Sequence, residues 1–179
     1  MLTSDSRPTS NSFLAELGVE PERGALLYQG VRYLLIRPET LSAFQKAVEE
    51  KLGAEADELL YAGGFAGGSL SAKKYRDVFK LTAEQSVAFM AQMGTEIGWG
   101  KLEIERLDMT VGELTVRVES SPFAAAYGRS ERGVCHLVRG VFAGLASGIF
   151  LREVTALEVE CAAMGHEHCK IVIRLKAMV

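Results

Sequence analysis

The feature that most constrains the fold is a set of four potential metal ligands near the end of the chain. All three cysteines and one glutamate follow the pattern C-x22-E-x2-C-x7-C, at Cys135, Glu158, Cys161 and Cys169. Three thiolates and a carboxylate make a complete tetrahedral set, and soft sulfur ligands favour Zn²⁺ over Mg²⁺ or Ca²⁺. One zinc ion bound by all four would have to draw distant segments together, and a filled ligand shell would make it structural.

The residues themselves leave two alternatives open. Three cysteines can equally be small buried hydrophobic side chains, and the short C-x-x-C chelate is absent. Other donors lie in the same stretch, and His168, beside Cys169, is the alternative to Glu158 as fourth ligand. Solvated loop positions are expected for Glu160, His166, Glu167 and His136. In a regular strand Glu158 and Cys161 would point to opposite faces, so the quartet predicts a bulge or turn between them.

Length and charge exclude several classes of protein. We expect a disordered polar tail over residues 1–12 and a single domain over residues 13–179. A net charge of −3 with interleaved signs gives no basic face for nucleic acid. The start of the chain lacks a signal-peptide core, and the longest apolar run, residues 134–151, contains His136 and Arg139. We therefore expect a cytoplasmic protein without a membrane span.

Hydrophobic periodicity predicts an α+β domain, in which a mainly antiparallel sheet packs against several helices. The expected strands are 25–28, 31–36, 102–107, 111–118, 154–159 and 170–175. The expected helices include one between Pro38 and Gly53, one begun by a Thr82–Gln85 capping box, a short one at 122–127 and an apolar one at 134–150. Residues 55–79 suggest a helix that the sequence GGFAGG, residues 63–68, would interrupt.

The spacing of the quartet resembles that of the 4-vinyl reductase domain family. The same domain is the sensor module of phenol- and toluene-responsive transcription activators, and its fold is shared with subunits of a vesicle-tethering complex. The resemblance covers roughly residues 20–176 and is most specific in the C-terminal third. It implies zinc at the Cys/Glu quartet and a buried hydrophobic ligand pocket formed by the segments before it.

An apolar stripe before the quartet is the candidate wall of that pocket, formed by Phe89, Met90, Met93, Ile97 and Trp99. The same stripe is equally compatible with ordinary core packing. Three glycines at four-residue intervals, Gly140, Gly144 and Gly148, indicate a close approach by a helix of this chain, a dimer partner or a ligand.

The resemblance also limits the ligand. Phenol-sensing members hold the ligand hydroxyl with a His and a Trp, whereas all three histidines here lie near the cysteines, so that clamp is missing. Since the chain ends soon after the domain, without an ATPase or helix-turn-helix module, it resembles the member from bacteriochlorophyll synthesis, which implies a tetrapyrrole or another flat apolar ligand.

Catalysis has little support in the sequence. No dinucleotide fingerprint, P-loop or spare cysteine set for an iron–sulfur cluster is present, so enzyme activity is open, with a non-enzymatic role favoured. We expect a homodimeric, zinc-containing protein that binds a hydrophobic small molecule as a sensor, carrier or delivery factor. The alternatives are an interaction module of a larger assembly and a part in vinyl reduction.

Overall fold

The computed structural model describes residues 11–177, and the chain divides into two compact units, Met1–Ile36 and Arg37–Val179. Each unit is described by itself. The predicted tail of residues 1–12 lies outside the described residues except for Asn11 and Ser12, and Ser12 already begins a helix. The predicted single domain over residues 13–179 spans both units and stays a prediction.

The first unit is a small antiparallel sheet with one helical turn. Its strands pair in the order β1-β2-β3, and Phe13 of the helix is buried with its ring 4.7 Å from that of Tyr28. The elements are α1 (Ser12–Glu16), β1 (Gly18–Glu20), β2 (Ala25–Tyr28) and β3 (Val31–Tyr33). The predicted hairpin is present, but its second strand ends at Tyr33, because the last pair that it makes with β2 is Leu26–Tyr33.

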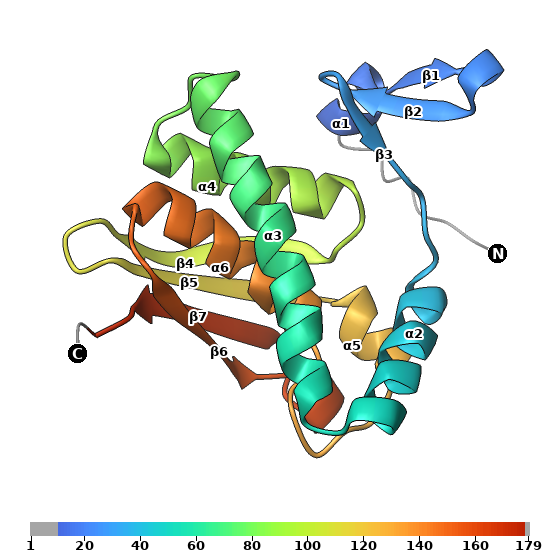
Figure 1. Cartoon of the computed structure of the whole chain (residues 1–179), viewed down its shortest axis with the longest axis vertical. Helices are drawn as coiled ribbons and strands as arrows, with labels where there is room; N and C mark the ends of the chain where they lie inside the picture. Colours follow the sequence, from blue (N-terminus) through green and yellow to red (C-terminus); the bar gives the residue numbers. More distant parts are fainter. Residues whose placement is uncertain (1–10, 178–179) are drawn as a thin grey trace, which may run out of the picture. The chain divides into compact units, whose positions relative to one another are not determined.

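The second unit is built on a four-stranded antiparallel sheet of order β4-β5-β7-β6 (Figure 1). The strands are β4 (Lys101–Asp108), β5 (Glu113–Glu119), β6 (Val154–Glu160) and β7 (Cys169–Leu175). Alternate residues of the two central strands, Leu114 and Val116 with Ile171 and Ile173, are fully buried. This alternation is the period-two signal of a sheet with one face in the core, and the predicted α+β class is confirmed.

The helices of this unit cover one face of that sheet. Helix α6 contacts β6 and β7, α4 contacts β4, and α3 packs along α6 (Figure 1). Their bounds are α2 (Pro38–Leu52), α3 (Glu55–Asp77), α4 (Ala83–Glu96), α5 (Pro122–Tyr127) and α6 (His136–Phe150). The predicted capping box of Thr82 and Gln85 begins α4, and Gly53 ends α2 as expected.

The expectation that GGFAGG would interrupt the third helix is wrong, because α3 runs without a break from Glu55 to Asp77. The glycines have a tertiary role that offsets their low helix propensity. A Cβ at Gly64 would collide with the backbone carbonyl of Leu137, and one at Gly68 with that of Val141. Residues 64 and 68 must therefore be glycine for α6 to lie this close.

The glycines of α6 answer those of α3. A Cβ at Gly140 would collide with the carbonyl of Tyr61, one at Gly144 with that of Phe65, and one at Gly148 with the side chain of Ala72. The close approach predicted from the glycine spacing is thus made by another helix of the same chain. No helix among the described residues is long and apolar enough to cross a bilayer.

Candidate functional site

The structure brings the predicted quartet together at one end of the sheet. Cys135 is the residue before α6, Glu158 lies in β6, Cys161 directly follows β6 and Cys169 begins β7. The β6–β7 register shifts between Glu158 and Glu160, which is the irregularity needed to turn Glu158 and Cys161 toward one point. Their four candidate ligand atoms all lie within 4.8 Å of one another.

The spacing of the sulfur atoms fits a shared zinc ion. The Sγ of Cys169 is 3.7 Å from that of Cys135 and 4.0 Å from that of Cys161. Two thiolates in a tetrahedral zinc site, each about 2.3 Å from the metal, are about 3.8 Å apart. The three cysteines are free and buried, so a bound ion would be shielded from water.

Glu158 is held in place by its surroundings. The backbone N–H of Cys135 donates to its Oε2 at 2.9 Å, while its Oε1 is buried without a hydrogen-bond partner among the described residues. Gly133 provides the space, since a Cβ there would lie 2.5 Å from the same Oε2. Sequence analysis did not single out Gly133, because it has no donor atom. A buried, half-satisfied carboxylate beside three thiols is suited to a cation.

The protonation equilibria of the quartet are strongly perturbed in the absence of a metal. Burial, together with a bond to Cys161, raises the pKa of Glu158 to about 7. Hydrogen bonds from Cys135 and Cys161 lower the pKa of Cys169 to about 4, whereas Cys135, as a donor in this network, has a raised pKa. The protein therefore concentrates partly compensated negative charge here, and these residues fit zinc.

The nearby histidines lie outside the quartet. His168 Nε2 is 2.9 Å from Glu160 Oε2, and His166 Nδ1 is 3.1 Å from the backbone oxygen of Cys161. His136 turns toward Asp57, with its Nε2 3.3 Å from Oδ1. The structure thus places Glu158, and not His168, beside the three thiols.

A second polar cluster, of Glu49, Asp57 and His136, was not predicted. Arg132 Nη1 contacts Asp57 at 2.9 Å, and the Tyr127 hydroxyl donates to Glu49 at 2.6 Å. The interpretation of these acids as a solvated face is therefore wrong for Glu49 and Asp57, which are partly buried. Since Arg132 balances their charge, the cluster ties the segment before α6 to α2 and α3, and no sequence period announces it.

The predicted apolar wall lies largely in the core. The Phe89 ring meets that of Tyr75 at 4.9 Å, the sulfurs of Met90 and Met93 each lie 3.8 Å from the Tyr75 hydroxyl, and Trp99 packs against Phe123. Ile97 is the half-buried residue that ends α4. None of the five lines either of the two cavities that follow, and their role in ligand binding stays a prediction.

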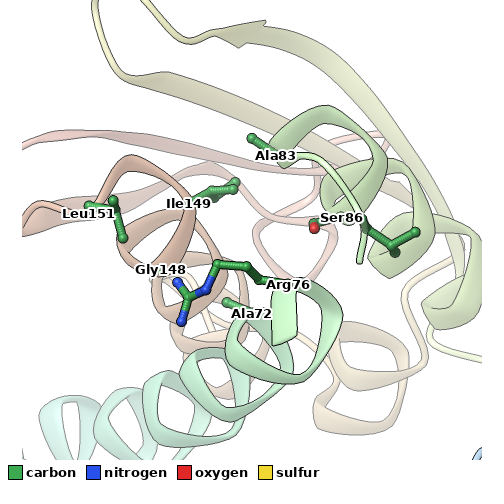
Figure 2. A pocket seen from close by; sticks show the side chains of 8 residues that line it. Ala72, Arg76, Ala83, Ser86, Gly148, Ile149 and Leu151 are labelled. Carbon is green, nitrogen blue, oxygen red and sulfur yellow. The ribbon is translucent and has the colours of Figure 1, made fainter. Parts of the chain in front are cut away.

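A cavity of about 110 Å³ lies where α3, α4 and α6 meet (Figure 2). Its lining is mostly small and apolar, with two polar side chains, Arg76 and Ser86. The lining residues are Ala72, Arg76, Leu81, Ala83, Ser86, Gly148, Ile149 and Leu151. The other hollow, of about 670 Å³, is open and lies between α5 and the β6–β7 connection, with Ser121, Arg129 and Glu167 on its walls. The smaller cavity is the more enclosed candidate site.

Comparison with known proteins places the quartet in a described family. Residues 114–175 match the model of the 4-vinyl reductase domain. The matched segment contains all four predicted metal ligands, and the resemblance inferred from their spacing is confirmed there. No curated protein matches the chain significantly.

Solved structures extend the likeness to this family over most of the chain. The phenol-responsive sensory domain of the transcription activator PoxR, solved with phenol, has 20% identity and a TM-score of 0.79, over 92% of this chain and 87% of that one. A vinyl-4-reductase family protein from Methanocaldococcus jannaschii has 16% identity and a TM-score of 0.55, over 81% and 85%. A trafficking protein particle complex subunit 3 from Naegleria fowleri, covalently bound to palmitic acid, has 14% identity and a TM-score of 0.56, over 79% and 96%. At these identities the likeness establishes the fold alone.

Proposed function

We propose that the chain is a zinc-containing protein of the 4-vinyl reductase domain type that binds a hydrophobic small molecule, as a sensor, carrier or delivery factor. The observation that carries the proposal is the cavity among α3, α4 and α6, which is apolar apart from two polar groups. Such a lining is typical of sites that take up small organic ligands. The fold shared with a phenol-responsive sensory domain, itself solved with a small aromatic ligand, adds support.

The size of the cavity favours a small ligand. Its volume, about 110 Å³, is somewhat below the roughly 150 Å³ of an engineered cavity that binds benzene. A single aromatic ring or a short aliphatic chain is therefore the best match. A tetrapyrrole is far larger, so the tetrapyrrole hypothesis requires α3 and α4 to move apart on binding.

The proposed zinc ion would be a structural cross-link. Held by Cys135, Glu158, Cys161 and Cys169, it would join the start of α6 to the β6–β7 pair. Structural zinc binds zinc-finger peptides with about 10–16 kcal/mol at neutral pH, against a typical folding stability of about 5–15 kcal/mol. Because α6 also forms one wall of the cavity, the ion would help to hold that wall in place.

Two measurements on one sample test this proposal. Elemental analysis of protein purified without chelator or affinity-tag metal should find one zinc per chain. Native mass spectrometry should detect a co-purifying small molecule, or titration with toluene or phenol should raise the melting temperature as a ligand of the native state does. Absence of zinc would refute the metal, and absence of any adduct or thermal shift would refute the binder.

A second candidate is an interaction module that forms a homodimer. The edge strand β6 carries two exposed apolar side chains, Leu157 at 63% and Val159 at 49%. An exposed apolar edge strand is a template for antiparallel pairing with a second copy, which gives the twofold symmetry most common in dimers. Light scattering after size-exclusion chromatography should show a dimer that Leu157→Lys dissociates and Thr155→Lys weakens less. A monomeric wild-type protein would exclude this candidate.

A further inference from the structure

We infer that the cavity among α3, α4 and α6 takes a small apolar carboxylic acid, bound as the carboxylate by Arg76. This inference rests on the small-molecule-binding function proposed above and names the class of ligand. It starts from the uneven distribution of polar groups in the lining. Six of the eight side chains offer no strong polar group, and the remaining two, Arg76 and Ser86, have opposite hydrogen-bonding capacities.

Arg76 is placed to receive an anion. It lies in the last turn of α3, and Figure 2 shows its guanidinium extending toward Gly148 near the end of α6. Its Nε contacts Asp77 at 2.9 Å, so the edge formed by its two Nη groups is the one suited to a carboxylate. Both partners of that ion pair are about half exposed, and exposed pairs of this kind contribute little. The bond to Asp77 is therefore no obstacle to a ligand.

The surroundings of Arg76 carry excess positive charge. A hydrogen bond from Arg76 and the charges of Lys73 and Lys80 lower the pKa of Asp77, the acid closest to them in sequence. Cations are favoured at a helix C-terminus, which accounts for the basic last turn of α3. At the mouth of an apolar cavity, in a chain of net charge −3, the same charge attracts small anions.

Ser86 determines the orientation of the ligand. Its side chain is almost fully buried, and its hydroxyl donates to the backbone oxygen of Thr82 at 2.7 Å. The hydroxyl therefore presents only acceptor lone pairs to the cavity, which repel a carboxylate. The acid group is directed to Arg76, and the apolar body lies against Ala72, Leu81 and Ile149. The volume of about 110 Å³ limits that body to one ring or a short chain.

The test compares benzoate with benzamide, which has nearly the same shape and no charge, by isothermal titration calorimetry at low salt. We expect benzoate to bind about tenfold more tightly, as a charge-assisted bond predicts. Arg76→Gln should abolish that preference while leaving benzamide binding and the melting temperature unchanged. High salt should reduce the preference, because it screens a partly exposed charge.

Two variants locate the site. Ala83→Leu, at the first residue of α4, fills the cavity and should abolish the binding of both probes while far-ultraviolet circular dichroism is retained. Arg129→Gln makes the same charge change beside the open hollow and should have no effect.

The outcomes separate the two proposals. If benzamide binds as tightly as benzoate, or if Arg129→Gln and not Arg76→Gln removes the preference, the acid assignment is overturned and small-molecule binding stands. If benzoate, benzamide, toluene and phenol all fail to bind, both proposals are refuted.

Discussion

Substituting Gly68 by alanine should separate the effect of helix propensity from that of helix packing. In a helix interior, alanine is favoured over glycine by about 1 kcal/mol. At Gly68 the added methyl group would occupy the position of the Val141 carbonyl of α6, and a backbone carbonyl cannot rotate away. Overpacking typically costs about 1–3 kcal/mol, and a backbone clash lies at or above the upper end of that range. We therefore expect Gly68→Ala to lower the free energy of unfolding by about 2 kcal/mol.

The neighbouring glycine is the matched control. Gly67 lies on the same helix, is exposed, and has nothing within 4 Å of where a Cβ would stand. Gly67→Ala should therefore raise the free energy of unfolding by about 0.5–1 kcal/mol. Urea unfolding followed by circular dichroism measures both variants, and the two are expected to differ by about 3 kcal/mol. Equal stabilisation by both alanines would refute the conclusion that glycine is needed for the contact between α3 and α6.

Three further predictions concern the quartet and the start of α4. Cys169→Ser or Cys161→Ser should yield insoluble or unstable protein without zinc, measured by elemental analysis and thermal unfolding; a soluble double variant with an unchanged melting temperature would contradict structural zinc. In metal-free protein, the raised pKa of Glu158 means that the folded state holds its proton longer than the unfolded chain. Stability from this group is therefore lost as the pH rises from about 4.5 to about 7, by roughly 3 kcal/mol in all, and Glu158→Gln should lack this component in urea titrations at several pH values. Thr82→Ala removes both halves of the capping box and should cost about 1 kcal/mol, whereas no change in the unfolding midpoint would show that the box contributes nothing.

The ligand quartet shows how far local signals extend. The spacing of Cys135, Glu158, Cys161 and Cys169 predicts their donor chemistry, and the odd interval between the middle two predicts a backbone irregularity, which the β6–β7 register shift provides. The choice between Glu158 and His168 depended on which side chain turns inward, and adjacency in sequence does not determine that. The structure answers it through Gly133 and the Cys135 N–H, which make room for Glu158 and hold it.

By itself, the sequence determined the elements whose signals span a few residues. The alternation of strands β4 and β5, the capping box of α4 and the end of α2 at Gly53 all depend on neighbours within one or two turns. Only the tertiary structure decided that GGFAGG stays helical, that Glu49 and Asp57 meet His136, and that the cavity lies beside Arg76 and not along the Phe89 stripe. In each case the deciding contact joins residues far apart in the chain. Helix and strand propensities contain no information about such contacts, because these depend on how the elements pack.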